Sequence, residues 1–189
     1  DLFEKLPVHW MWWPAIGALA VGLCGIIEVR SLGVGYENIT QTIAGTLSLK
    51  LIVSILVFKF ISWSIALGSG TSGGTLAPLL TLGASTGFLV GYAVQAFFPG
   101  LHLDKGTAAL VGMAAVFAGA SRAILASAAF ALEVTGQYQT ALPVLGACAT
   151  AWLVASALMK NSIMSEKIVR RGVHVPHEYV PAPVSGRLQ

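Results

Sequence analysis

The chain has 189 residues, of which 56% are hydrophobic and only 10% are charged, and its formal net charge is +3. A soluble domain of this length carries about a quarter charged residues, so the composition excludes an ordinary soluble domain and favours a chain embedded in lipid. The positive charge does not form the basic stripe, interleaved with aromatic residues, that a nucleic-acid-binding face requires. We therefore expect no nucleic-acid partner.

Five apolar segments of near-spanning length predict an all-α, polytopic membrane domain. They cover residues 10–27, 49–67, 76–98, 107–132 and 141–159. Three tryptophans open the first segment and Pro14 follows them, which is typical of a helix that begins at the headgroup level. Charge is also sparse within the segments, since Lys59 is the only charged residue between Leu51 and Leu103.

Two stretches interrupt this pattern of spans. Residues 31–48 are too polar and too rich in glycine to cross a bilayer alone, and they predict a short helix from Tyr36 to Leu47 that packs against protein. A turn at Gly33–Gly35 leads into it. The long segment 107–132 contains Gly-Ala-Ser-Arg at residues 119–122, which predicts two helices or one bent helix.

A glycine-rich stretch at residues 68–78 lies between two apolar segments and contains no charged residue. Irregular backbone at membrane depth is tolerated only where it is buried in protein or lines an aqueous cavity. Pro78 suits the first turn of the next helix, so the backbone N–H groups of residues 74–77 form the amino end of that helix. Such an end binds anions without a cation. From the spacing alone, a tight connection between packed helices is an equally good interpretation.

The absence of Lys and Arg from this stretch favours transport over tight capture, because a conducted ion must enter the site and also leave it. We expect the turn at Gly74 to favour a positive φ, since glycine adopts that conformation readily. Replacing Gly74 by Val should then disturb anion binding more than replacing Thr75 by Val.

Three runs of sequence resemble the CLC family of voltage-gated chloride channels and chloride/proton antiporters. GSGTSGGTLAPLLTLGASTG, from residue 68, is similar to the family's glycine-rich anion-binding motif. GMAAVFAGASRAILASAAFALEVTGQYQTALP, from residue 112, resembles a later segment, and LGVGYENI resembles the segment upstream of the motif. Together they cover residues 14–172 in one consistent order.

The resemblance implies that residues 1–172 are the C-terminal half of a membrane domain built as an inverted repeat, in which interrupted helices meet. It further implies a homodimer with one pore in each subunit, the bilayer and the missing N-terminal half as partners, chloride as the transported ion and no cofactor. The implied anion site is the backbone at Thr75 and Leu76, with Gly74, Ala77 and Pro78 beside it. Channel and exchanger stay open as alternatives.

Two residues depart from the family pattern. Leu76 stands where the family usually has Phe, which bears on the width and gating of the pore. Met164, in the run SIMSEKIVRRG, matches a position where a Tyr hydroxyl usually donates to the central chloride. A thioether cannot donate a hydrogen bond, so we expect the central site to lose one partner and the coupling between chloride and proton movement to loosen.

Arg122 and Glu133 are ionisable residues inside apolar segments, which makes them functional candidates. On one continuous helix they would share a face, about 16 Å apart, too far to pair. The family resemblance makes both structural rather than conductive, with Arg122 at a helix start and Glu133 beside a Thr-Gly turn. We expect no metal site, because the four histidines lie at segment ends or in the C-terminal tail.

The C-terminal part predicts the orientation of the chain. A basic cluster follows the last apolar segment at Lys160, Lys167, Arg170 and Arg171, and the positive-inside rule places it in the cytoplasm. Residues 173–189 contain three prolines and predict an exposed linker, which we expect to lead to a cytosolic regulatory domain of the CBS type.

Two other functions are alternatives. Residues 70–73, Gly-Thr-Ser-Gly, match the motif of rhomboid-type intramembrane serine proteases, but such a hydrolase needs a histidine within reach of its serine, Ser72. No histidine lies in a later apolar segment, so we predict that the chain is not an enzyme. The third candidate is a transporter of another small anion, since interrupted helices serve anionic substrates generally.

Overall fold

The computed structural model describes residues 3, 7, 9–71, 74–101, 103–159 and 162. This part of the chain forms seven α-helices and no strand. The helices are α1 (Trp13–Ile27), α2 (Tyr36–Ile43), α3 (Leu49–Gly68), α4 (Leu76–Phe97), α5 (Lys105–Ser121), α6 (Ile124–Thr135) and α7 (Ala141–Leu158). Short 3-10 turns cover Trp10–Trp12, Val29–Ser31 and Tyr138–Thr140.

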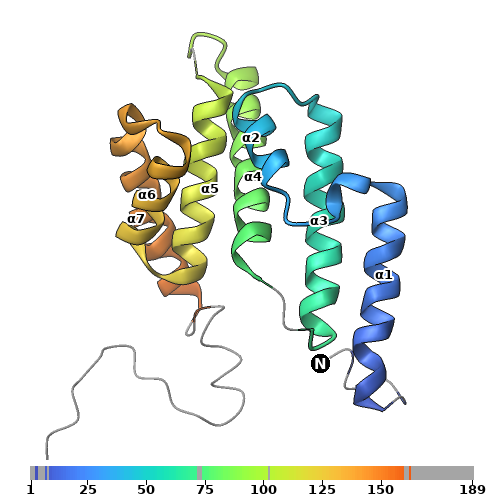
Figure 1. The fold of residues 1–189 in the computed structure, drawn as a ribbon. Helices are drawn as coiled ribbons and strands as arrows, with labels where there is room; N and C mark the ends of the chain where they lie inside the picture. The colour runs from blue at the N-terminus through green and yellow to red at the C-terminus, as the bar shows by residue number, and fades with distance from the viewer. Residues whose placement is uncertain are drawn as a thin grey trace, which may run out of the picture.

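The long helices stand side by side in one row, with α1 at one edge and the pair α6 and α7 at the other (Figure 1). In the row α1 contacts α3, α3 contacts α4, α4 contacts α5, and α5 contacts α6 and α7. The short helix α2 lies against α4 and α5. The buried core is centred on α4 and α5, which both have neighbours on two sides.

Four helical stretches are long and apolar enough to cross a membrane, namely Trp10–Ile27, Leu49–Gly68, Leu76–Phe97 and Tyr138–Leu158. The all-helical, polytopic prediction is therefore confirmed. The predicted segment 107–132 is two shorter helices, as its Gly-Ala-Ser-Arg interruption indicated. Helix α5 ends at Ser121, and Arg122 adopts a left-handed conformation with a φ of 60° before α6 begins.

Glycines bring α4 and α5 into direct backbone contact. A Cβ atom on Gly112 would lie 2.5 Å from the Cα of Gly87 and 2.6 Å from the carbonyl oxygen of Gly83. Both distances are shorter than any tolerable contact, so only glycine allows this approach. In lipid the hydrophobic effect does not drive helices together. Helices associate instead through the van der Waals contacts that small residues allow at close range.

Helix α2 follows the predicted turn but is shorter than expected. Gly33 and Gly35 both have positive φ angles, of 70° and 88°. The helix ends at Ile43 rather than Leu47, because Gly45 takes a φ of 67° and turns the chain away. Its buried residues Asn38, Ile39 and Thr42 face the packed helices, as expected for a helix held by protein.

Candidate functional site

The glycine-rich segment begins as a tight turn at the end of α3. Gly70 has a φ of 80°, and its N–H donates to the carbonyl oxygen of Leu67 at 3.3 Å. The buried hydroxyl of Ser69 lies 2.8 Å from the carbonyl oxygen of Ala66, to which it donates, and 2.9 Å from the hydroxyl of Thr71. The turn therefore satisfies its own polar groups as far as Thr71.

Helix α1 holds this turn in place. Gly17 of α1 packs so closely that a Cβ atom on it would lie 2.6 Å from the Oγ of Ser69. Ser69 is only 1% exposed as a result. The start of the glycine-rich segment is thus fixed between α1 and α3, and residues 72 and 73 lie outside the described part of the chain.

Helix α4 begins partway along the length of α3 rather than level with the end of α3 (Figure 1). Its N-cap, Thr75, makes no side-chain capping bond, and its first turn contains no acidic residue. The first N–H groups of an α-helix have no acceptor within the helix, and here they belong to Leu76 and Ala77, because Pro78 has none. A partial positive charge is therefore left at an amino end that lies inside the helical layer.

One expectation about this turn is wrong. Among the described residues of the segment, the positive φ belongs to Gly70, whereas Gly74 does not have one. A Cβ atom on Gly74 would also meet no atom of the described chain within 4 Å. The turn follows directly on the last hydrogen bond of α3, from the N–H of Ser69 to the carbonyl oxygen of Ile65. Gly70 is therefore the position where a β-branched residue would strain the backbone.

Lys59 is a site residue that the sequence analysis did not single out. It lies in the middle of α3, is 4% exposed, and donates from its Nζ to the carbonyl oxygens of Ser31 at 3.0 Å and Gly33 at 2.7 Å. Its isolation in an apolar segment was the available signal, because a charged residue inside a span is a functional candidate by default. The spacing of residues along the chain does not predict that the segment containing Ser31 and Gly33 would supply the acceptors.

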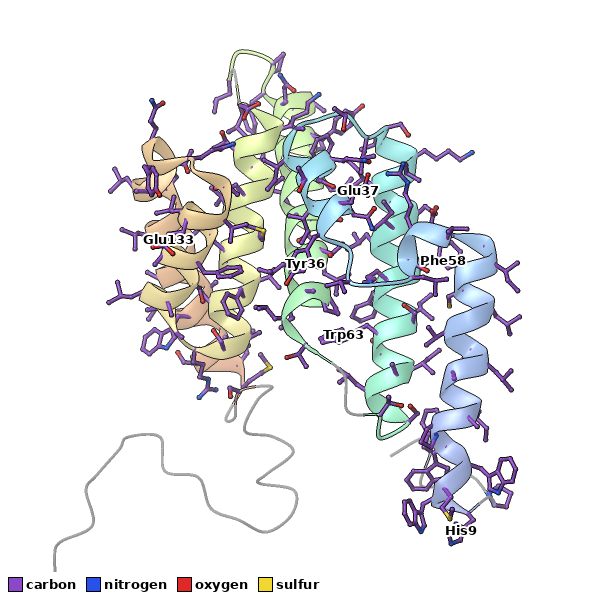
Figure 2. All side chains as sticks on the ribbon, in the orientation of Figure 1. His9, Tyr36, Glu37, Phe58, Trp63 and Glu133 are labelled. Atoms are coloured by element: carbon purple, nitrogen blue, oxygen red, sulfur yellow. The ribbon has the colours of Figure 1, made fainter. Side chains whose placement is uncertain are left out.

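Buried donors continue along the same face of α3. Trp63 follows Lys59 by four residues, which places both on one side of the helix. Its Nε1 is buried and has no acceptor in the described chain. Figure 2 shows Trp63 projecting from α3 toward the end of α4 at which that helix begins. The Oγ of Ser31, next to the Lys59 ammonium, is also buried without a partner among the described residues.

The predicted in-membrane charges lie apart from this region. The Arg122 guanidinium donates to the carbonyl oxygen of Met159, which joins the end of α5 to the end of α7. Glu133 is exposed on α6, at the far edge of the row from α1 (Figure 2), three residues before Gly136 with its φ of 67°. Met164 lies outside the described residues, as does Ser72.

The described residues give no support to a metal site, and Ser72, the candidate nucleophile of a serine hydrolase, lies outside them. No group of three or more His, Cys, Asp or Glu side chains is placed to hold a metal there. Of the four histidines only His9 is described, and it accepts from the N–H of Met11 at the N-cap of the first 3-10 turn.

The fold and the site define a polytopic helical membrane protein in which one apolar helix, α4, starts partway along its neighbour α3. The chain belongs to the voltage gated chloride channel family, whose model matches residues 1–156. The predicted family is therefore confirmed.

Two relatives illustrate the likeness. The chain is 38% identical over 174 residues to the H(+)/Cl(-) exchange transporter ClcA of Klebsiella pneumoniae, a match that covers 90% of this chain and 37% of the relative. It is 35% identical over 161 residues to the ClcA exchange transporter of Salmonella arizonae, covering 84% of this chain and 34% of that protein. The chain thus spans little more than a third of the length of these relatives.

Proposed function

We propose that the full-length protein transports chloride across a membrane and holds the ion in part at the amino end of α4. The supporting observation is that the N-cap side chain makes no capping bond to this end, that its first turn carries no acidic residue, and that it lies alongside the long apolar helix α3 and not level with the end of α3 (Figure 1). Backbone N–H groups and the helix dipole favour an anion there. The contributing groups are the backbone N–H groups of Thr75, Leu76 and Ala77, with Gly74 preceding them.

Proton-coupled exchange is favoured over simple conduction, because the matched relatives are named as H(+)/Cl(-) exchange transporters. We still expect Met164 to loosen the coupling between chloride and proton movement, because its thioether cannot donate a hydrogen bond to the ion. Transport of chloride and transport of another small anion differ only in selectivity at the same amino end, and the names of the relatives favour chloride.

The partners of the proposed protein follow from the inverted-repeat family. We infer that an N-terminal half supplies the second set of helix ends, that two such subunits form a homodimer, and that residues after Gly172 lie in the cytoplasm as a linker to a regulatory domain. Arg122 and Glu133 are assigned structural roles, and the only substrate proposed is chloride, without a cofactor.

The backbone site is tested by two variants of the full-length protein. Thr75→Val removes a hydroxyl but leaves the amides of α4, so chloride binding should stay within about twofold of wild type. Gly70→Val places a β-branched residue at a φ of 80°, which should re-aim the segment and weaken chloride binding at least tenfold. Isothermal titration with chloride measures both.

Gly74→Val serves as the matched control, because Gly74 has no positive φ and an added Cβ meets nothing in the described chain. Its chloride affinity should fall less than that of Gly70→Val. Loss of binding in Thr75→Val with normal binding in Gly70→Val would show that a hydroxyl, not the backbone, holds the ion. Chloride uptake with opposed proton movement in liposomes tests the transport itself.

A further inference from the structure

We propose that the buried ammonium of Lys59 is a fixed positive charge that strengthens anion binding at the amino end of α4 without touching the ion. The inference rests on the proposed chloride site and adds a residue that the family motif does not contain. Its starting point is the burial of a full charge in the middle of a spanning helix, where only 4% of the side chain is exposed.

The ammonium is held by neutral groups. Its two recorded acceptors are the carbonyl oxygens of Ser31 and Gly33, at 3.0 and 2.7 Å. No carboxylate of the described chain lies within salt-bridge distance of it. The carboxylate of Glu28, at the N-cap of the 3-10 turn that contains Ser31, accepts from Ser54, five residues further from the glycine-rich segment than Lys59. The charge is therefore solvated by dipoles and not neutralised by an ion pair.

The geometry places this charge near the first turns of α4. A Cβ atom on Gly35 would lie 3.8 Å from the Nζ of Lys59 and 2.9 Å from the Oγ1 of Thr81, so the two side chains meet around Gly35. Thr81 donates in turn to the carbonyl oxygen of Ala77, in the first turn of α4, at 2.9 Å. At 1.5 Å per residue, Thr81 lies about 7.5 Å along the axis from Leu76. The ammonium is then on the order of 10 to 15 Å from the amides of that turn.

A unit charge at such a distance matters only where water does not screen it. Lys59 is enclosed by α3, α4 and the segment that contains Ser31 and Gly33, so its field reaches the amino end of α4 through protein. With an effective dielectric constant of about 20, a positive charge about 12 Å away strengthens the binding of a monovalent anion about tenfold. A contact between cation and anion would bind far more tightly and would hinder release.

The neighbouring side chains favour the same sign of charge. Between Lys59 and the amino end of α4, the same face of α3 presents the indole N–H of Trp63, which is a donor without an acceptor in the described chain. A permeating anion on this side would meet an ammonium field, an indole N–H and the backbone N–H groups of Leu76 and Ala77 in turn. No acidic residue lies in α3 or α4 to oppose them.

The test compares three variants of the full-length protein with the wild type, each titrated with chloride. Lys59→Met removes the charge at nearly constant volume and should raise the dissociation constant about tenfold. Lys59→Arg keeps the charge and should stay within about threefold of wild type. Lys50→Met is the matched control, because Lys50 lies on the same helix but is exposed, so water screens its charge and the dissociation constant should not change.

A structural role is separated by two further measurements. The melting temperature of Lys59→Met in gluconate, without chloride, measures the stability lost with the two hydrogen bonds to the carbonyls of Ser31 and Gly33. Titration of the same variant with chloride and with bromide measures the effect of the charge, which must raise both dissociation constants by the same factor. If Lys59→Met does not fold, Lys59→Gln retains amide donors for the carbonyls and must show the same loss of affinity.

Three outcomes overturn the proposal: a chloride affinity of Lys59→Met or Lys59→Gln equal to wild type, a loss in Lys59→Arg as large as in Lys59→Met, or unequal factors for chloride and bromide. If the wild-type protein binds no chloride at all, the proposed function fails. If the wild-type protein binds chloride and the Lys59 variants have the same chloride dissociation constant as wild type, only the inference about Lys59 fails.

Discussion

Single glycines determine how closely the two central helices approach. A Cβ atom on Gly87 would clash with the carbonyl oxygen of Ala108 and would lie 2.8 Å from the Cα of Gly112. Both neighbours are backbone atoms of α5, which cannot rotate out of the way as a flexible side chain could. The contact between α4 and α5 therefore tolerates no added methyl group without a shift of one helix.

Gly87→Ala should destabilise the full-length protein by about 1 to 3 kcal/mol, the usual cost of overpacking a close contact. Gly22→Ala is its control on α1, because a Cβ there meets no atom of the described chain within 4 Å. Alanine raises helix propensity, so the control should be neutral or slightly stabilising. Thermal unfolding in detergent compares them, and equal melting temperatures would contradict the close contact.

At the scale of one element, α5 shows how a helix start is fixed by a cap. Asp104 accepts from the backbone N–H and from the hydroxyl of Thr107, both at 2.8 Å. The N–H bond and then the hydroxyl bond lower the pKa of the Asp104 carboxyl below its ordinary value of 3.8, because both favour the charged form. The cap lies outside the spanning segments.

Asp104→Ala should therefore cost about 1 kcal/mol of stability at neutral pH, whereas Asp104→Asn should keep most of the cap. Because the folded pKa is lowered, the contribution of the carboxylate is complete above about pH 4 and is lost as the pH falls through the folded value. The gap in melting temperature between wild type and Asp104→Asn should narrow on acidification. A difference in melting temperature that widens below pH 4 would show that folding does not lower the pKa of Asp104.

Most elements could be predicted from the sequence, because lipid imposes a simple length and polarity code on spanning helices. The break near Arg122 was predictable as well, from glycine and serine in an apolar run. The predicted end of α2, Leu47, is four residues beyond the observed end at Ile43. The sequence does not show that Gly45 ends the helix, because a glycine can also lie within one. The amino end of α4 followed from Pro78, which can only suit the first turn.

Long-range partners of the site were not predictable. Lys59 was visible as an isolated charge, but its acceptors lie 28 and 26 residues earlier, in a turn whose course depends on packing. The positive φ was expected at Gly74, whereas the structure has it at Gly70. Four glycines lie in the run 68–74, and composition alone does not rank them. The bond from Arg122 to Met159 likewise joins residues 37 apart.

At the scale of the whole molecule, the described helices form one open row with apolar side chains exposed on α1, α6 and α7. Among the largest of these are Ile26 at 79%, Leu142 at 82% and Leu158 at 79% exposure. A row of this kind brings the amino end of α4 alongside α3, from one side only. A pore of the inverted-repeat kind needs helix ends from both halves.

The 189-residue chain alone should therefore not carry chloride, whereas the full-length protein should. Chloride efflux from liposomes that contain the purified chain is expected to equal efflux from empty liposomes. Co-expression with an N-terminal half from the same protein is the positive control and should restore flux. Efflux above background from the chain alone would contradict the need for a second half.

The shortness of α2 has a consequence for how the protein is made. Its eight residues span about 12 Å, far less than the bilayer, and its buried face rests on α4 and α5. At about 5 to 20 residues per second, the end of α5 is synthesised roughly 4 to 16 s after the end of α2. During that interval the polar side chains of α2 have no packed partners. We expect α2 to wait at the membrane surface and to enter the protein after helices that follow it in the sequence, so the order of insertion differs from the order of synthesis.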